Sequence, residues 1–80
     1  MLAVVLKQKG RISESIVASQ TSVQLDPQDA EAHNNLGVML QEQGRLDEAE
    51  ASYRKAITLK PDLVEAHNNL GNTLKELVRP

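Results

Sequence analysis

The chain has 80 residues, of which 25% are charged, and a formal net charge of −2 at pH 7. Its length restricts it to a single small domain, and its negative charge argues against nucleic acid as a partner, because proteins that bind a phosphate backbone carry basic stripes. The sequence has no cysteine, which excludes disulfides and thiolate metal sites and is compatible with a reducing compartment such as the cytoplasm.

The first six residues, Met1 to Leu6, form an apolar run, and the charged Lys7 follows it. The run has no basic residue before it and is too short for a secretory signal sequence. It is also far shorter than the ~20 residues of a membrane span, so we expect no membrane partner. A short first helix is expected to end at Gly10, and a second helix is expected over residues 13–25, stopping before Pro27.

Three further helices follow along the chain. Residues 30–43 lack proline and follow Asp29, a plausible N-cap, while Gly44 behind them tolerates the positive φ of a helix C′ position. A helix over residues 46–59 is indicated by apolar residues spaced three or four apart, and Pro61 ends it. The last helix is expected over residues 64–78.

An internal repeat organises these elements. The segment His33-Asn34-Asn35-Leu36-Gly37 recurs 34 residues later as His67-Asn68-Asn69-Leu70-Gly71, and Gly10-Arg11 precedes Gly44-Arg45 by the same interval. A fixed period of about 34 residues is typical of one class of helix–turn–helix repeat. We therefore divide the chain into a partial degenerate repeat (1–29), a complete repeat (30–63) and a partial repeat consisting of a first helix (64–80).

These residues resemble the tetratricopeptide repeat (TPR) family. The pattern of large and small residues in that family is matched by His33, Leu36, Gly37, Leu40, Ala49, Tyr53, Ala56 and Pro61. The resemblance covers the whole chain and implies an all-α, right-handed α-solenoid of helix–turn–helix repeats with about five helices. Before residue 27 it is degenerate, since the places of Ala49, Tyr53 and Ala56 are taken by Ser15, Ser19 and Ser22.

The serine at position 19 cannot fill the volume that Tyr53 fills one repeat later. Loss of a large aromatic residue from a packed core costs roughly 3–5 kcal/mol unless the neighbours collapse inward. We therefore expect the first helix pair to pack loosely, with partial compensation from Ile16, Val17 or Val23.

A helical wheel at about 100° per residue gives each first helix of a repeat a packing side and a free polar side. The free side is predicted to bind an extended peptide and holds Glu31, Asn34, Asn35, Val38, Gln41 and Glu42, then Glu65, Asn68, Asn69, Asn72 and Lys75. Stacked repeats join such sides into a concave surface, and an asparagine amide can both donate to and accept from a peptide backbone. The alternative interpretation is a solvated polar face without a ligand.

The family resemblance also suggests what that surface binds. Asn35 and Asn69 look like the asparagine ladder in the superhelix of O-linked N-acetylglucosamine transferases, which implies that they hold the backbone of an extended partner. The clamp of chaperone-binding repeats requires Lys and Arg, whereas Glu65 and Asn69 occupy the matching places here, which argues against a chaperone C-terminus as the ligand. Two alternatives stay open: a piece of a larger repeat protein, such as the substrate-recruiting array of a glycosyltransferase, and self-association through uncapped ends.

The sequence contains no motif that indicates catalysis or metal binding. No nucleophile motif, phosphate-binding glycine loop or metalloprotease signature is present, so we expect neither catalytic residues nor a cofactor. His33 and His67 are the only histidines, and a metal site needs three or four convergent ligands. We therefore expect both histidines to be half-buried structural residues rather than metal ligands.

Overall fold

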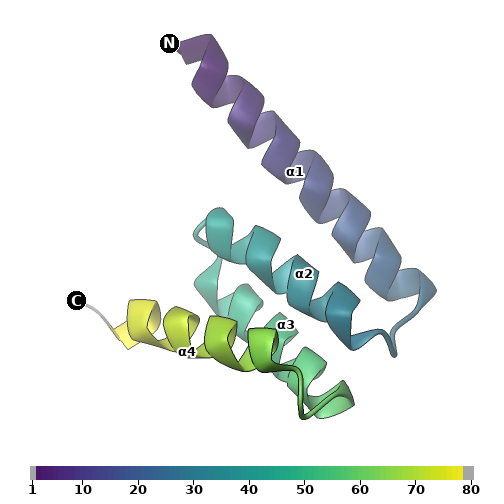
Figure 1. Ribbon diagram of the computed structural model, residues 1–80. Helices are drawn as coiled ribbons and strands as arrows, with labels where there is room; N and C mark the ends of the chain where they lie inside the picture. The colour runs from purple at the N-terminus through teal and green to yellow at the C-terminus, as the bar shows by residue number, and fades with distance from the viewer. Residues whose placement is uncertain (1, 79–80) are drawn as a thin grey trace.

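The computed structural model describes residues 2–78, with side chains described for residues 14–78. This part of the chain forms four helices, α1 (Leu2–Leu25), α2 (Ala30–Glu42), α3 (Leu46–Leu59) and α4 (Val64–Val78). The helices α2 and α4 lie side by side, α3 packs against both of them, and α1 runs along α2 (Figure 1). The predicted all-α helical-repeat fold is therefore confirmed.

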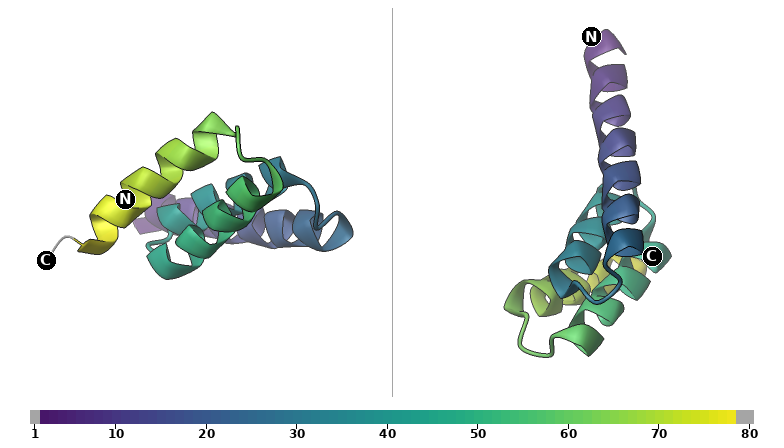
Figure 2. Two further views of the ribbon diagram at one scale, coloured as in Figure 1. Left: turned by 90° about the horizontal axis from the view of Figure 1, so that it is seen from below. Right: turned by 90° about the vertical axis from the view of Figure 1, so that its right-hand side faces the viewer.

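The helix α1 is continuous where two helices were expected, so the described chain has four helices rather than about five. It passes straight through Gly10, whereas the equivalent Gly44 turns the chain with a φ of 77°. Glycine inside a helix costs only about 1 kcal/mol, so a turn forms only where the joined helices gain by packing. The helices on either side of Gly44 pack on each other, but the N-terminal half of α1 projects beyond the other helices (Figures 1 and 2).

The ends of α2 are closed as the sequence predicts. The carboxylate oxygen Oδ1 of Asp29 accepts hydrogen bonds from the backbone N–H groups of Glu31 (3.1 Å) and Ala32 (3.3 Å), which makes Asp29 the N-cap. At the other end, the N–H of Gly44 donates to Gln41 O and the N–H of Arg45 donates to Leu40 O, both at 2.9 Å. These two bonds form a Schellman motif, which fixes the turn into α3.

The core is small and is shared by three helices. Its buried members are Ile16, Leu36, Leu40, Ala49 and Tyr53. Of the three residues expected to compensate for Ser19, Ile16 is 4% exposed and Val23 packs against this cluster, whereas Val17 is 62% exposed. No helix among the described residues is long and apolar enough to span a lipid bilayer.

The glycine at position 37 lets α2 approach the ring of Tyr53. A Cβ built on Gly37 would lie 2.5 Å from Tyr53 Cε1 and 2.7 Å from Cδ1, whereas a Cβ on the equivalent Gly71 meets nothing within 4 Å. We expect Gly37→Ala to lower the free energy of unfolding by up to about 2 kcal/mol, because an overpacking cost of about 1–3 kcal/mol is offset by a helix-propensity gain of about 1 kcal/mol.

The matched variant Gly71→Ala is expected to raise the free energy of unfolding by about 0.5–1 kcal/mol, because it gains helix propensity without a clash. Chemical denaturation of both variants measures the contrast. Two changes of the same sign would contradict the close approach of α2 to Tyr53.

Candidate functional site

The structure places the predicted peptide-binding residues on α2 and α4, and their burial differs. Seven side chains are exposed: Glu31, Asn35, Glu42, Glu65, Asn68, Asn72 and Lys75. Three are half-buried: Val38, Gln41 and Asn69. Asn34 is buried. We call this set, without Asn34, the α2–α4 face.

Asn34 corrects the expectation of an entirely free polar side. Its side chain is 3% exposed, and its Oδ1 accepts a hydrogen bond from the Nδ2 of Asn69 (3.1 Å). The wheel of an isolated helix cannot locate the next repeat, and α4 covers the part of α2 where Asn34 lies. The pair therefore holds two repeats together and uses one of the two N–H groups of the Asn69 amide.

A second hydrogen-bonded connection passes through Gln41. The hydroxyl of Tyr53 donates to Gln41 Oε1 (2.7 Å), and Gln41 Nε2 donates to Glu76 Oε1 (2.9 Å). This relay joins α3, α2 and α4, so it fixes the relative positions of the two helices that carry the face. Burial raises the pKa of the Tyr53 hydroxyl to about 12, with smaller contributions from the negative charges of Glu42 and Glu76.

The two histidines connect each first helix to the loop before it. The ring Nε2 of His33 donates to the carbonyl oxygen of Pro27 (3.0 Å), and that of His67 donates to Pro61 O (2.7 Å). His33 is half-buried as expected, but His67 is exposed, so that expectation is wrong for His67. Within residues 14–78 no group of three His, Cys, Asp or Glu side chains is placed to hold a metal ion.

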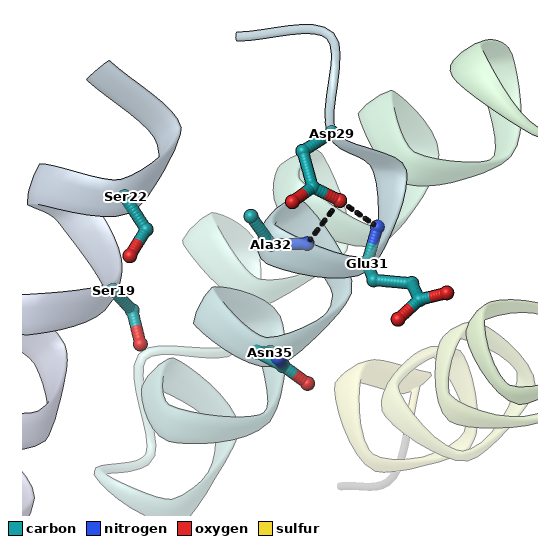
Figure 3. Close-up of a pocket in the computed structure, with 6 residues that line it drawn as sticks. All are labelled: Ser19, Ser22, Asp29, Glu31, Ala32 and Asn35. Carbon is teal, nitrogen blue, oxygen red and sulfur yellow. Dashed lines mark hydrogen bonds between the residues drawn. The ribbon is translucent and has the colours of Figure 1, made fainter. Parts of the chain in front are cut away.

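A polar hollow lies between α1 and α2 (Figure 3). It encloses about 210 Å³ and is lined by Ser19, Ser22, Asp29, Glu31, Ala32 and Asn35. We call it the α1–α2 pocket. Of these six residues, the sequence indicates only Glu31 and Asn35 as site residues, although Ser19 in the place of Tyr53 is a signal of unfilled volume.

A second hollow, of about 400 Å³, lies between α3 and α4. Its lining contains none of the predicted site residues and consists of Arg54, Ile57, Thr58, His67 and Leu70. It is therefore separate from the polar side that the sequence singled out.

One protein-family model matches this chain. A family model described as TPR repeat matches residues 5–44 and again residues 39–78, so the two matches together cover most of the chain. A search of the curated proteins found no match.

Proposed function

Because the chain belongs to the tetratricopeptide repeat family, whose repeats generally mediate protein–protein interaction, we propose that it is a non-catalytic module that binds an extended peptide segment of a protein partner on the α2–α4 face. Repeats of this architecture present extended concave surfaces suited to such ligands.

The observation that carries this proposal is a set of exposed amides whose side chains have no hydrogen-bond partner among the described residues. The side chains of Asn35, Asn68 and Asn72 are exposed, and none of them forms a side-chain hydrogen bond within residues 14–78. An amide offers a donor and an acceptor together, which matches the alternating N–H and C=O groups of an extended backbone. The relay through Gln41 and the bond between Asn69 and Asn34 support the proposal because they hold the two helices in one arrangement.

The proposed likeness to the asparagine ladder of glycosyltransferase superhelices applies differently to Asn35 and to Asn69. The side chain of Asn35 has no hydrogen-bond partner within residues 14–78, whereas one N–H of the Asn69 amide donates to Asn34. Asn69 therefore offers a ligand its amide oxygen and one remaining N–H. Replacing Asn69 would also leave the buried Oδ1 of Asn34 without a donor, which costs about 1–3 kcal/mol.

The test therefore uses Asn35→Ala rather than a change at Asn69. Peptides selected for binding to the chain from a random linear library serve as probes, and affinity is measured by calorimetry. We expect Asn35→Ala to weaken binding by roughly fivefold, since it removes a hydrogen-bonding group worth about 1 kcal/mol. Its exposed position predicts an unchanged fold by circular dichroism.

The control is Gln24→Ala, which removes an exposed amide from α1 instead of α2. It is expected to leave the affinity unchanged. Equal affinities for the original chain and Asn35→Ala, with the fold intact, would rule out the proposed role of this face.

A further inference from the structure

The α1–α2 pocket differs from its counterpart one repeat later. Its lining residues correspond, 34 positions on, to Tyr53, Ala56, Leu63, Glu65, Ala66 and Asn69. In that counterpart the ring of Tyr53 is fully buried and Leu63 is half-buried. The pocket therefore coincides with three differences between the repeats: Ser19 in place of Tyr53, Ser22 in place of Ala56, and Asp29 in place of Leu63.

The side chains that face the pocket offer acceptor oxygens: two serine hydroxyls, which can also donate, and a carboxylate. The side chains of Ser19 and Ser22 point from α1 toward α2, and Asp29 lies opposite them at the start of α2 (Figure 3). The Oδ1 of Asp29 caps α2, while its Oδ2 accepts no hydrogen bond within the described residues. Among residues 14–78, no Lys, Arg or His lines the pocket, so the pocket suits a cationic donor.

The size of the pocket limits what it can hold. Its volume of about 210 Å³ is below the roughly 300–1,000 Å³ of pockets for small-molecule ligands. One side chain fits this space better than a cofactor. An ammonium group supplies three donors and a compact charge on a flexible stem, which matches two hydroxyl oxygens and one carboxylate oxygen.

We propose that the α1–α2 pocket receives the basic side chain of a lysine in the bound partner. This inference rests on the proposed function and adds a specificity element to it. Asn35 belongs both to the α2–α4 face and to the pocket lining, so a peptide lying along that face can place one side chain between α1 and α2. The exposed carboxylates of Glu31, Glu42 and Glu65 on the face favour the same positive charge in the ligand.

The experiment is an NMR titration of the full chain with Nα-acetyl-lysine N-methylamide. We expect shifts of the backbone amides of Ser19, Ser22 and Asn35. The norleucine analogue, which has an uncharged stem, is expected to give none. Equal shifts with the norleucine analogue, or no shifts with the lysine compound, would overturn the proposal.

A charge-neutral variant tests the carboxylate. Asp29→Asn removes the charge but keeps a good N-cap residue, so the fold is retained. It is expected to raise the Kd of the lysine compound roughly twofold to fivefold, the range of an exposed ion pair. The matched variant Asp62→Asn, in the loop before α4, is expected to leave the Kd unchanged, and an equal effect of both variants would contradict a local role for Asp29.

The pocket and the peptide-binding face can fail separately. Library peptides that bind in an Asn35-dependent way while the lysine compound causes no shift would overturn the pocket and leave the proposed function intact. Pocket shifts with the lysine compound in a chain for which no library peptide binds would support the pocket and contradict the proposed function.

Discussion

Tyr53→Ala is expected to lower the free energy of unfolding by about 3–5 kcal/mol. The ring is fully buried, lies against Gly37 and belongs to the core cluster with Leu36 and Leu40. A chain of this length has a total stability of roughly 4–12 kcal/mol. Removal of this one side chain is therefore expected to take away at least about a quarter of that stability, which denaturant titration followed by circular dichroism measures.

The chain contains its own control for this prediction. Ser19 occupies the position one repeat before Tyr53, and its half-buried side chain borders the α1–α2 pocket. Ser19→Ala is expected to change the free energy of unfolding by no more than about 0.5 kcal/mol. A similar loss from both variants would contradict the conclusion that the core is concentrated around Tyr53.

The stability of the chain is expected to fall between about pH 10 and about pH 12 because of Tyr53. The pKa of its hydroxyl is raised to about 12 in the folded state, against about 10 in an unfolded chain. Between these values the unfolded state loses its proton while the folded state keeps it, so rising pH favours unfolding. The expected loss is about 1.4 kcal/mol per pH unit, up to about 2.7 kcal/mol in total.

Lysine side chains titrate in the same range, so the measurement requires Tyr53→Phe for comparison. That variant is expected to lose about 1 kcal/mol near neutral pH, because Gln41 loses its donor, and to show a shallower decline at high pH. Tyr53 is the only aromatic residue, so tyrosinate absorbance reports its ionisation alone. Ionisation of the folded chain near pH 10, or equal declines in both proteins, would contradict the burial of the hydroxyl.

The sequence was sufficient to predict the parts of the fold that depend on local signals. Residues 46–59 and 64–78 form helices as predicted, and α2 ends one residue earlier than the predicted 43. Their ends follow from nearby residues: the cap at Asp29, the positive φ of Gly44 and the helix-stopping Pro61. The 34-residue period also predicts that equivalent helices of successive repeats pack in the same way.

The predictions that were wrong concern positions whose environment depends on a neighbouring helix, which the pattern of one helix cannot locate. Gly10 has the same following residue as Gly44 but no turn, because a turn depends on the packing of the helices that it joins. The helical wheel predicts a free side chain for Asn34, but α4 covers this part of α2. The α1–α2 pocket required both the volume missing at Ser19 and the position of α1 beside α2, and only the first of these could be recognised from the sequence.

The central claim, that an extended peptide binds on the α2–α4 face, is tested most directly by NMR mapping of a library-selected peptide on the isotope-labelled chain. We predict that the largest shifts fall on the side-chain amides of Asn35 and Asn72, with little change at Arg54 and Lys55 on α3. Shifts concentrated on α3, with Asn35 and Asn72 unmoved, would contradict the claim.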